Sequence, residues 1–111
     1  MNLDLPHVAI VLKDREIAPV LLTSLRKLTG QSLGDIRAAV ATHRPVVQEE
    51  LFSNGYFDDG ISRLRTIVAL LQNSDVGFEI YEIREGESYE TSDLGACRIT
   101  PETLENILTG S

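Results

Sequence analysis

Residues 17–44 constrain the fold most, because they hold two stretches of helical periodicity separated by the pair Thr29-Gly30. A proline is tolerated only in the first turn of a helix, so Pro19 predicts that the first helix begins near Ala18. Gly30 is typical of a helix C-terminus. The inner face of this helix is predicted from apolar residues at helical spacing: Ile17, Val20, Leu21, Leu25 and Leu28.

The second helix follows directly. Ser32 is a favourable N-cap, and Asp35 stands three residues later, close to a capping-box pattern. The residue before a proline avoids helical backbone, so Pro45 predicts that this helix ends near His43. Its inner face is predicted from Leu33, Ile36, Ala39 and Val40. The two helices therefore form a helical hairpin, residues 17–44.

Three strands and a further helix are predicted around this hairpin. Residues 7–12 form a short apolar run rich in β-branched side chains, which predicts a central strand. Residues 46–52 predict a second strand, and residues 77–84 alternate apolar and polar residues as a third strand would. Between them, Asp58 or Asp59 is predicted to cap a helix. The inner face of that helix is Ile61, Leu64, Ile67, Val68 and Leu71.

After residue 84 the composition changes. Residues 85–93 are polar and acidic and predict a loop, Arg98-Ile99 is a candidate short strand, and Thr100-Pro101 predicts the start of a small helix. The expected fold is α+β, in the order β-α-α-β-α-β, with a three-stranded sheet and its helices packed on one face. We expect a single domain, 1–111, with a core at 7–84 and a C-terminal appendage at 85–111 that carries the short helix.

Charge is distributed unevenly along the chain, whose net charge is −7. Residues 13–44 contain six basic and three acidic residues, whereas residues 48–111 contain four basic and thirteen acidic residues. The acidic total argues against general nucleic-acid binding, which needs a basic surface. No apolar run approaches the roughly 20 residues of a membrane helix, and the N-terminus lacks the features of a signal peptide. We therefore expect a cytoplasmic protein that binds neither nucleic acid nor membrane.

No catalytic or metal-binding pattern stands out. Nucleophilic catalysis needs a hydroxyl or thiol beside a histidine and an orienting group. His7 is predicted at an exposed strand entry and His43 at a helix end, and Cys97 is the single cysteine. A lone cysteine excludes an intrachain disulfide and the usual zinc-ligand spacing. We expect a non-enzymatic protein without a cofactor or a metal.

The hairpin contains the run Leu25-Arg26-x-x-Thr29-Gly30-x-x-Leu33-x-Asp35-x-Arg37-x-x-Val40. This run resembles Val-Arg-x-x-Thr-Gly-x-x-Leu-x-Glu-Ala-Lys in the C-terminal domain of the bacterial ribosomal stalk protein. That domain shares its fold with the N-degron adaptor of the Clp protease, and the resemblance covers roughly residues 7–84.

The resemblance implies a protein-binding role for the exposed face of the hairpin, which recruits translational GTPases in the stalk domain. Arg26 falls on the family's arginine and Arg37 on a basic position of its second helix. Thr23 and Ala18 stand where the family usually has lysines of the binding face. Asp14 and Pro19 partly match the Asn-Asp-x-x-x-Pro entry of the Clp adaptor, which binds peptide amines.

Two functions from different classes follow. The first is a protein–protein interaction domain whose hairpin contacts another protein through Leu22, Thr23, Arg26, Lys27 and Arg37. The alternative is an acidic immunity or inhibitor protein that neutralises a basic toxin or enzyme through residues 79–93. Its contact residues are predicted to be Glu85, Glu87, Tyr89, Glu90 and Asp93.

Overall fold

The computed structural model describes residues 6–14, 16–51, 59–84, 87, 89 and 94–110. Within them, a four-stranded sheet has the order β2-β1-β3-β4, and every neighbouring pair is antiparallel. The strands are β1 (His7–Leu12), β2 (Pro45–Glu50), β3 (Phe78–Ile83) and β4 (Arg98–Ile99). The α+β class is thus confirmed, as are the three predicted strands. The expected sheet of three strands is wrong, because Arg98-Ile99 pairs with Ile80-Tyr81 of β3.

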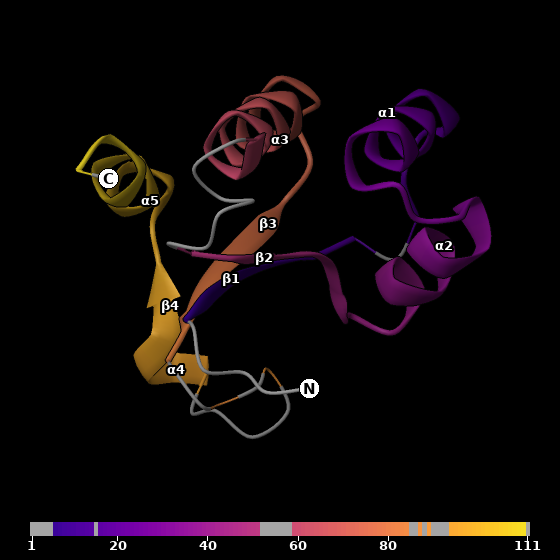
Figure 1. Ribbon diagram of the computed structural model, residues 1–111. Helices are drawn as coiled ribbons and strands as arrows, with labels where there is room; N and C mark the ends of the chain where they lie inside the picture. The colour runs from indigo at the N-terminus through magenta and orange to yellow at the C-terminus, as the bar shows by residue number, and fades with distance from the viewer. Residues whose placement is uncertain are drawn as a thin grey trace.

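Helices cover both faces of the sheet, and not one face as predicted. Figure 1 shows α1, α3 and α5 on one side of the sheet, the short α4 on the other, and α2 beside α1. Ile36 and Val40 of α2 belong to the same core cluster as α1 and α3. The helices are α1 (Pro19–Thr29), α2 (Leu33–Ala41), α3 (Ile61–Asn73), α4 (Leu94–Cys97) and α5 (Pro101–Thr109). α4 was not predicted, because four residues are too few to show a helical period.

The pleat of the central strand β1 divides the core in two. Val8, Ile10 and Leu12 face the four larger helices and belong to the main hydrophobic core. Ala9 and Val11 face the other way. They form a second, smaller cluster with Tyr81, Ile83 and Cys97, against which Tyr89 and Leu94 pack.

The C-terminal segment is part of the main core. Leu104 and Leu108 of α5 are 1% and 3% exposed and join the cluster beneath α3. Arg65 of α3 forms an ion pair with Glu105 of α5 at 2.8 Å. Residues 98–110 therefore extend the sheet and its helical layer, where an appendage was expected.

Local capping signals set the ends of the hairpin helices. α1 begins at Pro19 with Ala18 as N-cap, and Gly30 ends it with a left-handed φ of 75°. The Ser32 hydroxyl accepts a hydrogen bond from the Asp35 N–H at 3.1 Å, as the capping pattern predicts. α2 ends at Ala41, two residues before the expected end, and His43 has a positive φ of 57°.

The inner face of α1 differs from the predicted one. Val20 is 79% exposed, whereas Leu22, which was predicted to contact a partner, is only 4% exposed. Leu21, Leu22 and Leu25 form the buried face. Residues two apart lie roughly 200° apart around a helix, so the burial of Leu22 turns Val20 toward solvent.

α3 begins later than its capping prediction. Gly60 is the N-cap and makes no side-chain cap hydrogen bond. Asp58 lies outside the described residues, and Asp59 precedes the N-cap. The predicted inner face is confirmed, since Leu64, Ile67 and Leu71 are buried and Ile61 and Val68 pack against the core. Among the described residues, no helix combines the length and the apolar character that crossing a membrane requires.

Candidate functional site

The helical hairpin carries a groove between its two helices, which we call the hairpin groove. Its volume is about 410 Å³. It runs between the first half of α1 and the last half of α2, which a short turn brings side by side (Figure 1). Its lining consists of Glu16, Ile17, Pro19, Leu22, Arg37, Val40 and Ala41.

The sequence explains why this space stays open. Leu22 and Val40 are buried and form the floor, so neither side chain projects into the groove. The exposed positions beside them are Pro19 and Ala41, whose side chains are too small to fill the gap. The result is an apolar depression with Arg37 and Glu16 at its rim.

Three basic residues of the hairpin, Arg26, Lys27 and Arg37, are exposed. Within the described residues, the ion pairs involve Arg63, Arg65 and Arg98, and none involves these three. Their charges are therefore available to an acidic ligand.

The structure brings the predicted contact residues onto one element but not into one cluster. Leu22 and Arg37 line the hairpin groove together. Arg26 follows Leu22 by one helical turn, and Thr23 and Lys27 form a second exposed row along α1. Ile17, Val40 and Ala41 also line the groove but were not predicted to do so, because helical periodicity placed Ile17 and Val40 in the core and no pattern singled out Ala41.

The residues of the acidic alternative are only partly described. Glu85, Glu90 and Asp93 lie outside the described residues, as does the rest of the loop apart from Glu87 and Tyr89. The Tyr89 ring packs edge-on against Tyr81, with ring centroids 5.9 Å apart, and the Tyr89 hydroxyl donates to the His43 carbonyl at 3.4 Å. Tyr89 thus ties this segment to the second hydrophobic cluster.

Glu79 connects β3 to β4 on that face. Its carboxylate accepts a hydrogen bond from the Tyr81 hydroxyl at 2.8 Å and forms an ion pair with Arg98 at 3.2 Å. The pKa of Tyr81 is raised to about 12, mainly because the phenol is buried and secondly because it donates this hydrogen bond. The phenol therefore stays protonated at neutral pH and acts as a structural donor.

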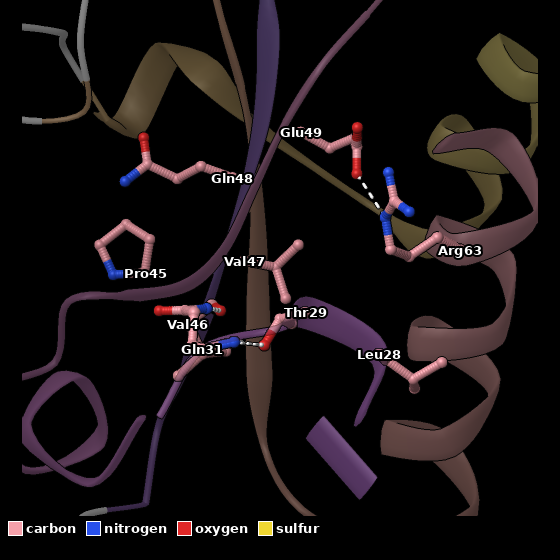
Figure 2. A pocket seen from close by; sticks show the side chains of 9 residues that line it. All are labelled: Leu28, Thr29, Gln31, Pro45, Val46, Val47, Gln48, Glu49 and Arg63. Atoms are coloured by element: carbon pink, nitrogen blue, oxygen red, sulfur yellow. Dashed lines mark hydrogen bonds and ion pairs between the residues drawn. The ribbon is translucent and has the colours of Figure 1, made fainter. Parts of the chain in front are cut away.

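A second groove, of about 500 Å³, follows the outer edge of β2, and we call it the β2 groove (Figure 2). At one end Arg63 of α3 donates from Nε to the Glu49 carboxylate at 2.8 Å. This hydrogen bond, with the charges of Glu49 and Asp59, raises the pKa of Arg63. At the other end the Gln31 side-chain amide donates to the Val46 carbonyl at 2.6 Å.

Residues that could support catalysis or metal binding do not converge in the described structure. His7 is 5% exposed, so its predicted exposure is wrong, because β2 and β3 flank it on both sides. His43 is exposed beyond the end of α2, and Cys97 is buried in the second cluster. The described residues contain no group of three or more His, Cys, Asp or Glu side chains arranged to hold a metal ion.

Comparison with known proteins identified no relative of this chain. No family model, no curated protein and no solved structure matches the chain.

Proposed function

We propose that this chain is a small, non-enzymatic protein–protein interaction domain that binds a partner segment through the helical hairpin. The observation that carries the proposal is the hairpin groove, which pairs an apolar floor of Leu22 and Val40 with the exposed cation Arg37 at its rim. An apolar pocket with a few polar groups at its margin is the usual form of a ligand site.

The chemistry of the groove specifies the partner segment. An apolar side chain of the partner would enter the depression between Pro19 and Ala41 and cover Leu22. Acidic residues beside that anchor would meet Arg37 and, one turn from Leu22 along α1, Arg26.

Two further considerations support the same surface. The described ion pairs leave Arg26, Lys27 and Arg37 to solvent, although the protein as a whole is acidic. The resemblance of residues 25–40 to the stalk-domain hairpin also implies binding by this element, and the first six elements follow the β-α-α-β-α-β order predicted from the sequence.

Selection from a random peptide display library against the immobilised protein tests the proposal. Selected peptides are then measured by fluorescence anisotropy against Arg37→Glu, against Ala41→Trp, which fills the groove from an exposed position, and against Arg84→Glu as a matched control. Arg84 is exposed at the end of β3, away from the hairpin, and its reversal changes the net charge equally.

We expect the peptides to share an apolar residue flanked by Asp or Glu. Arg37→Glu should weaken the binding of these peptides by roughly 1 kcal/mol, about fivefold, and Arg84→Glu should leave it unchanged. Peptides without acidic residues, or with equal affinity for wild type, Arg37→Glu and Ala41→Trp, would refute the hairpin groove as the binding site.

A further inference from the structure

The outer edge of β2 has an open half. The Leu51 N–H donates to the Pro6 carbonyl at 2.8 Å, and Glu49 stands opposite Val8. The backbone N–H and C=O groups of successive residues point to opposite sides of a strand. Since Glu49 and Leu51 face β1, the N–H and C=O groups of Gln48 and Glu50 point away from it. In the described part of the chain no strand pairs with β2 on that side.

The other half of the same edge is closed. The register shifts opposite Val46, between Ile10 and Val11, which marks a β-bulge. The Gln31 side-chain amide donates a hydrogen bond to the Val46 carbonyl, which is therefore not available to another strand, and Pro45 has no N–H to donate. Bulges, prolines and side-chain covers are devices that protect edge strands from pairing. In β2 these protective features end before Gln48, so another strand can pair with residues 47–50.

The β2 groove provides side-chain contacts for a strand placed at this edge. Figure 2 shows Val47 and Glu49 on one side of β2 and Gln48 on the other. Leu28 from the end of α1 is partly exposed and is the main apolar contact on the helix-facing side, because Val47 is only 4% exposed. An added strand would therefore place every second side chain, of apolar type, against Leu28.

Charge specifies the remaining side chains of the added strand. Glu50 lies on the sheet face away from the large helices, opposite His7, and is exposed without an ion pair to any described residue. On the helix-facing side the Glu49 carboxylate is already paired with Arg63 at 2.8 Å, so the charge preference of the added strand rests on Glu50. Basic side chains therefore suit this edge, and acidic ones do not.

We propose that the open half of β2 accepts an extended, alternating apolar and basic segment of a partner protein as an additional strand. A second copy of this chain fits less well. Self-pairing through Gln48 and Glu50 would set Glu49 directly opposite its own counterpart, and like charges in opposed positions are destabilising. Each copy also carries a net charge of −7.

The probe is the acetylated and amidated peptide Thr-Val-Lys-Val-Lys-Val-Thr, compared with the same peptide carrying Glu in place of Lys. Binding is followed by amide NMR shifts and by hydrogen-exchange protection of the full chain. Gln48→Pro removes an outward N–H, a change that edge strands tolerate. Glu50→Lys reverses the proposed charge contact, and Glu102→Lys on the exposed side of α5 is its matched control.

We expect the lysine peptide to shift and protect the Gln48 and Glu50 amides, and Gln48→Pro to weaken it roughly two- to tenfold. Glu50→Lys should weaken it by a similar factor and Glu102→Lys should not. If Gln48→Pro fails to fold, N-methylation of the central peptide residue removes the same backbone pairing from the probe side.

Three results would overturn the proposal: equal binding of the glutamate peptide, amide shifts confined to the hairpin groove, or a dimer in sedimentation that is abolished by Glu50→Lys. The first and third results concern the edge of β2 alone and leave the hairpin groove as the site of the proposed function. The second would also contradict the preference of the hairpin groove for acidic ligands, because the bound peptide is basic.

Discussion

Truncation of Leu104 to alanine tests whether the C-terminal segment belongs to the core. The Leu104 side chain is 1% exposed and packs in the main cluster from α5. Removing a fully buried leucine side chain costs about 2–5 kcal/mol, depending on how far the cavity collapses. α5 lies at the margin of the helical layer and can relax, so we expect about 3 kcal/mol.

This loss is large enough to measure in two ways. For a chain of this length it lowers the melting temperature by about 12 °C. With a denaturant slope of about 1.5 kcal/mol/M it lowers the urea midpoint by about 2 M. Far-UV circular dichroism follows both transitions, and Leu33→Ala is the matched control, because Leu33 is 37% exposed and should lose less than about 1 kcal/mol.

The reasoning would be refuted if Leu104→Ala cost less than about 1 kcal/mol at an unchanged slope. It would also be refuted if the variant unfolded in two steps, the first confined to the C-terminal segment. Either result would restore the picture of residues 85–111 as an appendage on an independent core.

Three other consequences concern local features. The pKa of Tyr81 is raised to about 12 from an ordinary 10.0, so the unfolded chain loses this proton at a lower pH than the folded chain does. The free energy of unfolding should therefore fall as the pH rises from about 10 to about 12, and Tyr81→Phe should lack that part of the fall. Gly30→Ala should cost about 1 kcal/mol in urea unfolding, purely from its φ of 75°, since no atom lies within 4 Å of an added Cβ. Glu49→Gln should lower the free energy of unfolding by about 1 kcal/mol in thermal unfolding. The double variant with Arg63→Gln should be little less stable than Glu49→Gln alone, because the half-buried ion pair is the main interaction of both residues.

The parts of the fold that follow from neighbouring residues were predictable. Gly30 and Ser32 set helix ends through contacts within a few residues, and the apolar face of α3 follows a regular helical period. The place of β4 in the sheet was not predictable, because its two residues become a strand only by pairing with Ile80 and Tyr81 from an earlier segment of the chain. No local pattern carries that information.

The candidate site depends even more on tertiary structure. The hairpin groove exists because Pro19 and Ala41, 22 positions apart, face each other across two packed helices. Periodicity predicted each helix but not its rotation, and a modest rotation of α1 exchanges the exposure of Val20 and Leu22. The open edge of β2 likewise became visible only with the strand order, because the sequence does not state which strand is outermost.

The uneven distribution of charge along the sequence corresponds to two surfaces of opposite charge in the structure. Arg37 at the rim of the hairpin groove takes part in none of the ion pairs among the described residues, whereas the open end of β2 carries Glu49 and Glu50. Arg44 and Pro45 lead directly from one element to the other. Salt weakens both proposed contacts, since both are partly electrostatic, so ionic strength cannot distinguish them. Charge reversal can. Arg37→Glu should affect acidic ligands alone and Glu50→Lys basic ligands alone, and if either variant weakened both classes, the two surfaces would have to be treated as one site.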